Sequence, residues 1–273
     1  GGYVFRTEIV ALLARLEEMG EWSPEEKTAP SLRLAALDPA SALAQSDGLH
    51  ATLRAIERTW QLHPHRALLN LGLLDVPSSA LATCDPDGQL GWRAREAVCC
   101  ALGHIADATA LRRLGEAVLD PDEDVRAAAL NALVAIGSSD AANALADGTQ
   151  SPFQEDTHGV AEALAAIGTP ALETVRRLSL SSWWEERRAA AVALVNWRGS
   201  RQDAVDMALP MAVDCEYRVA DAAREALVRH GLQPRAEVVE ETLRRATPVT
   251  IASLEPWLGM DVGNHLLDQA RGE

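Results

Sequence analysis

The 273-residue chain has few basic residues for its length, and this shortage narrows the range of partners. Lys27 is its only lysine, and 25 Lys and Arg stand against 40 Asp and Glu, which gives a formal net charge of −15. Sequence-independent binding to nucleic-acid phosphates requires a Lys/Arg footprint. The sequence therefore predicts no nucleic-acid partner. The acidic balance fits a protein partner with a basic surface, or a charge that simply keeps the chain in solution.

Cysteine is also scarce, and the four cysteines indicate neither a disulfide framework nor a metal site. They form no C-x-x-C pair. His63 and His65 with Cys84 are the best candidates for a zinc site, but zinc needs three or four ligands with matched spacing, and no fourth is evident. We therefore expect no metal and no cofactor. The four cysteines are Cys84, Cys99, Cys100 and Cys215.

Membrane-length apolar runs and catalytic signatures are missing as well. The residues given show no signal-peptide pattern and no apolar run long enough to cross a bilayer. It has no G-x-S-x-G, P-loop or G-x-G-x-x-G motif. From these absences we expect a non-catalytic, cytoplasmic protein with no membrane contact.

What the sequence does contain is an amphipathic helix that recurs. In the segment 120–137 the apolar residues fall at steps i, i+3, i+4, i+7, i+8 and i+11, which is the stripe of one helix face. Gly137 follows the stripe, where a left-handed cap residue is needed, because only glycine takes a positive φ without steric cost. The stripe residues are Val125, Ala128, Ala129, Ala132, Leu133 and Ile136.

The end of this helix, Ala-Leu-x-x-Ile-Gly or a close variant, is found five times. Successive copies are separated by steps of 31, 31, 30 and 33 residues. A fixed period near 31 residues predicts a solenoid in which each helix pair packs on its neighbours. The copies begin at Ala101, Ala132, Ala163, Ala193 and Ala226.

The periodicity also predicts the organisation of the chain. Residues 90–231 form the regular array, residues 1–89 form a helical N-terminal region with degenerate repeats, and residues 232–273 form a helical cap, because a terminal repeat has no neighbour to cover it. The segments between the recurring helices are expected to be their partner helices. Those segments are 108–119, 140–146, 170–178 and 204–213.

The array resembles HEAT repeats, in the short form of bacterial proteins and phycobilin lyases. Asp120 lies six residues before Arg126, at the start of the recurring helix. The resemblance implies an all-α, right-handed solenoid of helix–turn–helix repeats. It also implies a ladder of aspartate–arginine pairs between adjacent repeats, and second helices that line a concave face. The ladder is expected to be interrupted, because its arginine position is occupied by Arg95, Arg126, Thr157, Arg187 and Ala220. Its acidic position holds Asp120 or Asp214 in only two copies.

Several classes of protein have folds similar to this repeat array, and the sequence argues against one of them. The iron-dependent deoxyhypusine hydroxylases bind metal through His-Glu pairs, whereas none of the seven histidines here precedes a glutamate.

We expect a protein-binding scaffold, adaptor or regulatory subunit with its partner on the concave face. The alternative is a small-ligand or tetrapyrrole-handling protein of the phycobilin-lyase type. A lesser alternative is a nucleobase-directed enzyme of the HEAT-like DNA glycosylase type.

The candidate partner-binding residues are tryptophans at the starts of second helices and the outward positions of those helices. Tryptophan and arginine dominate binding hot spots. The opposing interpretation is a packed turn between repeats and an ordinary solvated helix face. Trp197, in contrast, replaces a stripe isoleucine and is expected in the core. The candidates are Trp92, Arg93, Glu96, Asn131, Glu162, Trp183, Trp184, Arg188, Asp221, Arg224 and Glu225.

Overall fold

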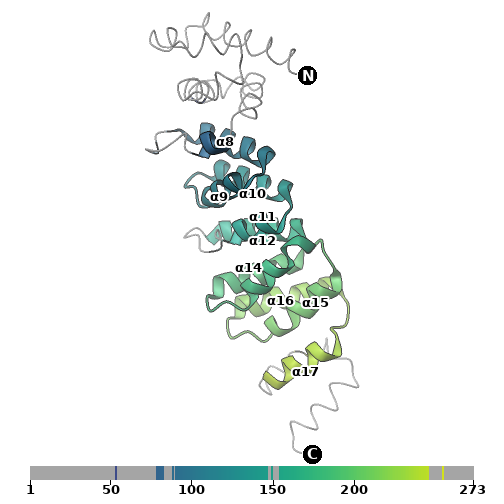
Figure 1. Cartoon of the computed structure of the whole chain (residues 1–273). Coiled ribbons are helices and arrows are strands. Elements are labelled where there is room, and N and C mark those ends of the chain that lie inside the picture. The colour runs from purple at the N-terminus through teal and green to yellow at the C-terminus, as the bar shows by residue number, and fades with distance from the viewer. Residues whose placement is uncertain are drawn as a thin grey trace, which may run out of the picture. The chain divides into compact units, whose positions relative to one another are not determined.

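The computed structural model describes residues 78–82, 88, 90–146, 149 and 154–245, together with Leu53 and Leu254. Every regular element within these ranges is a helix, which confirms the expected all-α class (Figure 1). Most of the expected N-terminal region, with the zinc candidates His63, His65 and Cys84, lies outside the described residues. The expected cap beyond residue 245 also lies outside them, apart from Leu254.

The chain divides into two compact units, Gly1–Ile136 and Gly137–Glu273. In the first unit, α8 packs along α10, and α9 packs against both. Leu102, Leu114 and Leu133 come from these three helices and are fully buried. The described helices of this unit are α7 (Ser78–Ala82), α8 (Trp92–Ile105), α9 (Ala108–Ala117) and α10 (Glu123–Ile136).

The second unit continues the alternation of first and second helices. The first helices are α11 (Ser139–Ala146), α13 (Leu172–Ser179), α15 (Arg201–Met211) and α17 (Ala236–Arg245). A 3₁₀ turn, Thr169–Ala171, leads into α13. The second helices are α12 (Gln154–Ile167), α14 (Trp184–Val195) and α16 (Tyr217–His230). Helix α14 contacts both α12 and α16, while α15 contacts α14, α16 and α17.

The helices expected between the recurring segments are all present, and local capping sets their limits. Helix α15 begins three residues before the expected start at 204, because the Ser200 hydroxyl accepts a hydrogen bond from the Asp203 backbone N–H at 3.3 Å. Helix α9 begins at the expected residue, where the Asp107 carboxylate accepts from the Ala110 N–H at 2.8 Å.

Residues that end several second helices have the left-handed backbone conformation that the sequence predicted at Gly137. Gly137 and Gly231 have φ values of 63° and 62°. Ala106 takes the same role after α8 with a φ of 58°. A non-glycine residue in this region is strained by roughly 1 kcal/mol or more. The repeat therefore enforces its cap geometry even where the sequence offers no glycine.

Trp197 is buried in the core, as its place in the stripe predicted. Its side chain is only 5% exposed. The ring lies against Gly199, where an added Cβ would come within 2.5 Å of the indole nitrogen. The Arg198 backbone N–H donates to the Ala165 carbonyl at 3.1 Å, which ties this turn to α12. The large ring thus occupies space that a side chain at position 199 would need.

Two arginine–aspartate pairs join successive repeats and confirm the expected ladder. Arg95 donates from Nε and Nη2 to the two carboxylate oxygens of Asp120, both at 2.8 Å. Arg187 does the same to Asp214 at 2.7 and 3.0 Å. Each arginine also donates to a carbonyl of the turn before its own helix, Leu90 at 2.7 Å and Ser181 at 3.0 Å. One side chain therefore fixes two consecutive inter-helix turns.

Candidate protein-binding surface

The structure places the eleven candidate residues in two groups, one in each unit. In the second unit, Trp183, Trp184 and Arg188 lie at the start of α14, and the partly exposed face of α16 beside it carries three more candidates. Glu162 lies on α12, the other neighbour of α14. The α16 candidates are Asp221, Arg224 and Glu225. In the first unit, α8 carries Trp92, Arg93 and Glu96, and α10 carries Asn131.

The candidates differ in how far they reach solvent. Asn131, Glu162, Trp183, Asp221 and Glu225 are exposed. The remaining six are half-buried. These six are Trp92, Arg93, Glu96, Trp184, Arg188 and Arg224.

Four residues at the starts of α14 and α16 form what we call the aromatic cluster: Trp183, Trp184, Tyr217 and Arg218. The Arg218 guanidinium lies 5.1 Å from the Trp184 ring centroid and 5.4 Å from the Tyr217 ring centroid. Its Nε also donates to the Tyr217 hydroxyl at 3.1 Å. Trp183 and Tyr217 are 65% and 63% exposed. Two aromatic rings and one cation are therefore held close together at the surface.

Tyr217 and Arg218 were not among the residues predicted from the sequence, although their repeat position indicates them. Trp92, Trp184 and Tyr217 are the first residues of α8, α14 and α16. Each stands three residues before the ladder arginine position of its repeat. In the first unit the same arrangement recurs, with the Arg93 guanidinium 4.4 Å from the Trp92 ring centroid. An aromatic residue thus stands at this position in three repeats, and in two of them, at Trp92 and Tyr217, an arginine follows it.

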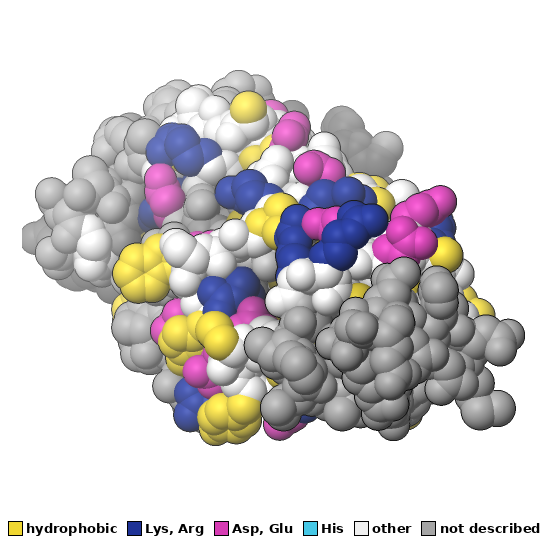
Figure 2. All heavy atoms as spheres, turned by 90° about the horizontal axis from the view of Figure 1, so that it is seen from below, with side chains coloured by type: hydrophobic (Ala, Val, Ile, Leu, Met, Phe, Trp, Pro, Cys, Tyr) yellow, Lys and Arg dark blue, Asp and Glu magenta, His cyan; other side chains and the backbone are white. Residues whose placement is uncertain are grey.

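The charges around the cluster are mixed and weakly paired. Arg224 lies 3.3 Å from Asp221, and His158 lies 3.4 Å from Glu162, in pairs whose side chains remain partly in water. Exposed pairs of this kind contribute little, on the order of 0.5 kcal/mol. Figure 2 shows Lys/Arg and Asp/Glu side chains interspersed with hydrophobic ones over one face of the molecule. Such a surface suits a folded protein partner better than a single-sign polymer.

The segments that the structure describes offer little for metal or thiol chemistry. No group of three His, Cys, Asp or Glu side chains there is arranged to hold a metal ion. Burial raises the pKa of the Cys99 thiol to about 12, which keeps this cysteine protonated and unreactive. Cys100 and Cys215 are exposed.

A helix that crosses a membrane must be both long and apolar. None of the described helices meets both conditions.

The comparisons with known proteins agree with this all-α repeat architecture. A family model of HEAT repeats matches residues 90–165, from just before α8 to near the end of α12. The match begins where the periodicity placed the start of the regular array, and it contains the Arg95–Asp120 pair. HEAT repeats commonly mediate protein–protein interaction. The comparison with curated proteins gave no match.

Proposed function

We propose that this chain is a non-catalytic protein-binding module, acting as a scaffold, adaptor or regulatory subunit. Its partner docks on the second-helix face, which we define as the exposed surface of α12, α14 and α16. The observation that carries the proposal is the aromatic cluster, where Trp183 and Tyr217 remain 65% and 63% exposed. Large aromatic side chains left in water are costly unless a partner covers them.

The cluster is well suited to serve as an anchor because three of its four side chains, those of Trp184, Tyr217 and Arg218, already contact one another through Arg218. Arg218 is held by two rings and by the Tyr217 hydroxyl, so it loses little side-chain freedom when a partner binds. Tryptophan, tyrosine and arginine are the residue types enriched in binding hot spots. The same arrangement favours a partner that presents an apolar side chain flanked by a carboxylate or carbonyl group.

The charged residues next to the cluster supply specificity. Arg188 on α14 and Asp221, Arg224 and Glu225 on α16 present both signs on two helices that contact each other. Charges at the rim of an interface mainly set the register and the association rate, and salt weakens their effect. The proposed mechanism is therefore an aromatic anchor surrounded by salt-sensitive polar contacts.

The experiment that tests this proposal is affinity capture of the tagged chain from its native cells. Bound proteins are identified by mass spectrometry, and the absorbance of the eluate is recorded from the ultraviolet to the red. We expect one stoichiometric protein that is released as salt is raised, because the rim contacts are ionic. A colourless eluate without a protein partner contradicts the proposal. A coloured eluate without a protein partner favours the small-ligand alternative instead.

A further inference from the structure

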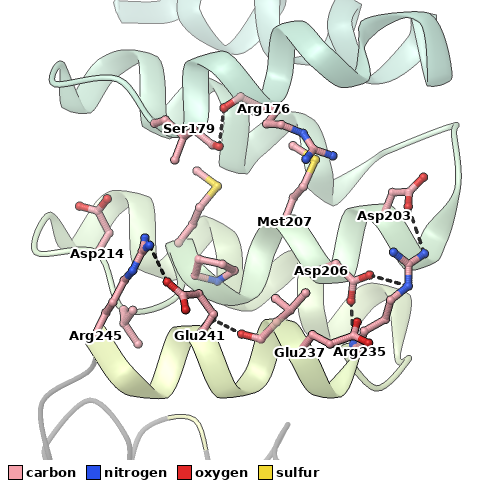
Figure 3. Close-up of a pocket in the computed structure, with 16 residues that line it drawn as sticks. Arg176, Ser179, Asp203, Asp206, Met207, Asp214, Arg235, Glu237, Glu241 and Arg245 are labelled. Atoms are coloured by element: carbon pink, nitrogen blue, oxygen red, sulfur yellow. Dashed lines mark hydrogen bonds and ion pairs between the residues drawn. The ribbon is translucent and has the colours of Figure 1, made fainter.

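The first-helix layer of the second unit contains a groove that the sequence did not indicate. The groove has a volume of about 580 Å³ and lies over α15, between α13 and α17. Figure 3 shows Arg176 and Ser179 of α13 facing Glu237, Glu241 and Arg245 of α17, with side chains of α15 between them. This volume falls within the range of about 300–1,000 Å³ that is typical of ligand-binding clefts.

The groove has an apolar lining that a partner can cover. Leu180 follows α13 and is 77% exposed, the most exposed large apolar side chain in the described ranges. Met207 of α15 and Val238 of α17 are half-buried, and Pro210 is exposed between them in the sequence. Methionine adapts its shape to different apolar surfaces. The lining therefore suits contact with apolar side chains of varied shape.

The charged groups of the groove leave a negative excess. Five carboxylates line it, against three guanidiniums, and one of the five, Asp214, is already paired with Arg187 of α14. Arg235 is shared between two of the carboxylates, Asp203 at 3.5 Å and Asp206 at 3.2 Å. Arg245 pairs with Glu241 at 2.6 Å. The carboxylates are Asp203, Asp206, Asp214, Glu237 and Glu241, and the guanidiniums are Arg176, Arg235 and Arg245.

A backbone feature adds to this negative character. Pro210 lies inside α15 and has no N–H, so it donates no hydrogen bond to the Asp206 carbonyl one turn earlier. Both residues line the groove. One carbonyl of α15, in a residue that lines the groove, thus lacks its usual intrahelical donor.

We propose that this groove binds a basic amphipathic helix of a protein partner. The apolar face of that helix packs on Leu180, Met207 and Val238, and its Lys or Arg side chains face the surplus carboxylates. Docking of a helix in an apolar groove is a recurring mode of recognition, and the charge of the groove selects the basic partner. A second copy of the chain is disfavoured, because it carries the same net charge of −15. This site is separate from the aromatic cluster on the second-helix layer and does not depend on it.

The test uses a fluorescent peptide of about 18 residues, long enough to form a helix, with leucine and lysine placed at helical spacing. Its binding to the full chain is followed by fluorescence anisotropy. A peptide of the same composition with alternating residues tests the helical requirement, and a Leu/Glu peptide of the same spacing tests the charge. We expect the Leu/Lys helix to bind at least about tenfold more tightly than either control peptide, because only it offers both complementary faces.

Matched variants locate the binding. Leu180→Ser is expected to weaken binding of the Leu/Lys helix by about tenfold, the effect of one lost apolar anchor. Val228→Ser removes a similarly exposed side chain, 68% exposed on α16, and should change affinity less than about twofold. Glu237→Gln should weaken binding and reduce its salt dependence, whereas Glu225→Gln on α16 should not. All four positions lie at or near the surface, so the fold is retained.

Each contrary result overturns the inference. Absence of binding, equal binding of the Leu/Glu helix, or an equal loss in Val228→Ser and Leu180→Ser contradicts the groove as a site for a basic helix. Loss of peptide binding in Trp183→Ala assigns the peptide to the aromatic cluster instead. Dimerisation seen by sedimentation velocity and abolished by Leu180→Ser assigns the groove to a second copy of the chain. Failure of the native capture experiment leaves this result unaffected, because the peptide assay needs no cellular partner.

Discussion

Replacing Arg187 with methionine is expected to lower the free energy of unfolding by about 3 kcal/mol. The substitution removes two hydrogen bonds to Asp214 and two to the carbonyls of Ser181 and Ser182. It also leaves the Asp214 carboxylate, whose side chain is 11% exposed, without its cationic partner. Urea denaturation at pH 7, followed by circular dichroism, measures the effect.

The control for this prediction is an arginine whose ion pair lies in water. Arg112 pairs with Glu116 at 3.0 Å, and the two side chains are 65% and 48% exposed. Arg112→Met should therefore change stability by no more than about 0.5 kcal/mol. Similar losses in the two variants would show that the Arg187 ladder does not hold the repeats together.

The contribution of this pair should also depend on pH in a defined direction. Burial raises the pKa of Asp214. The hydrogen bonds from Arg187 and from the Glu216 backbone N–H lower it by more, so the pKa lies below its ordinary value. The hydrogen bond to Asp214 raises the pKa of Arg187. A lowered carboxylate pKa contributes stability above the unfolded value, about 3.9, and this stability is lost as pH falls through the folded value. The difference between the native chain and Arg187→Met should narrow below that range, and a difference independent of pH would contradict the account.

Gly103→Ala is the second substitution with a large expected effect, and its sign is informative. Helix propensity alone predicts a gain of about 1 kcal/mol, because Gly103 lies within α8. The added Cβ would, however, come within 2.6 Å of the Ala132 Cβ and 3.1 Å of its Cα on α10. Two backbone-anchored atoms cannot approach so closely, so the helices must separate. Overpacking of this kind costs about 1–3 kcal/mol, and we expect a net loss on thermal unfolding.

A second substitution distinguishes steric overlap from other effects. Ala132→Gly removes the opposing Cβ and by itself should cost about 1 kcal/mol in helix propensity. Added to Gly103→Ala, it should restore some of the lost stability, because the overlap is relieved. A Gly103→Ala variant as stable as the native chain, or a double variant less stable than either single one, would contradict the close packing of α8 on α10.

Features that repeat along the chain were predictable from the sequence. The spacing of the Ala-Leu-x-x-Ile-Gly copies predicted the alternating helices, and Gly137 predicted a left-handed cap with the observed φ of 63°. The resemblance to HEAT repeats predicted the arginine–aspartate ladder, found at Arg95–Asp120 and Arg187–Asp214. These features depend on local geometry or on contacts one repeat away, and a periodic pattern records both.

The surface features were harder to predict, because they depend on irregular residues. Tyr217 and Arg218 occupy the repeat position of Trp184 and its successor, yet a search for tryptophans alone passes over them. The groove joins Leu180, Met207 and Glu237 from three successive first-helix segments, which the repeat period places side by side, but the period does not show which side chains leave an open space between those helices. The roles of Trp92, Glu96 and the other candidate residues in partner binding stay predictions.

The central claim is that a protein partner is anchored by the aromatic cluster. The most direct measurement compares the affinity of the captured partner for the native chain, for the double variant Trp183→Ala with Arg218→Ala, and for Arg112→Ala, with circular dichroism to verify folding. Loss of an aromatic and arginine anchor is expected to weaken binding by at least about 30-fold, or about 2 kcal/mol. Arg112→Ala, whose side chain is 65% exposed on the first helix α9 and lies outside the second-helix face, should stay within about twofold of the native chain. Equal affinities in all three proteins would contradict the claim and place the partner elsewhere.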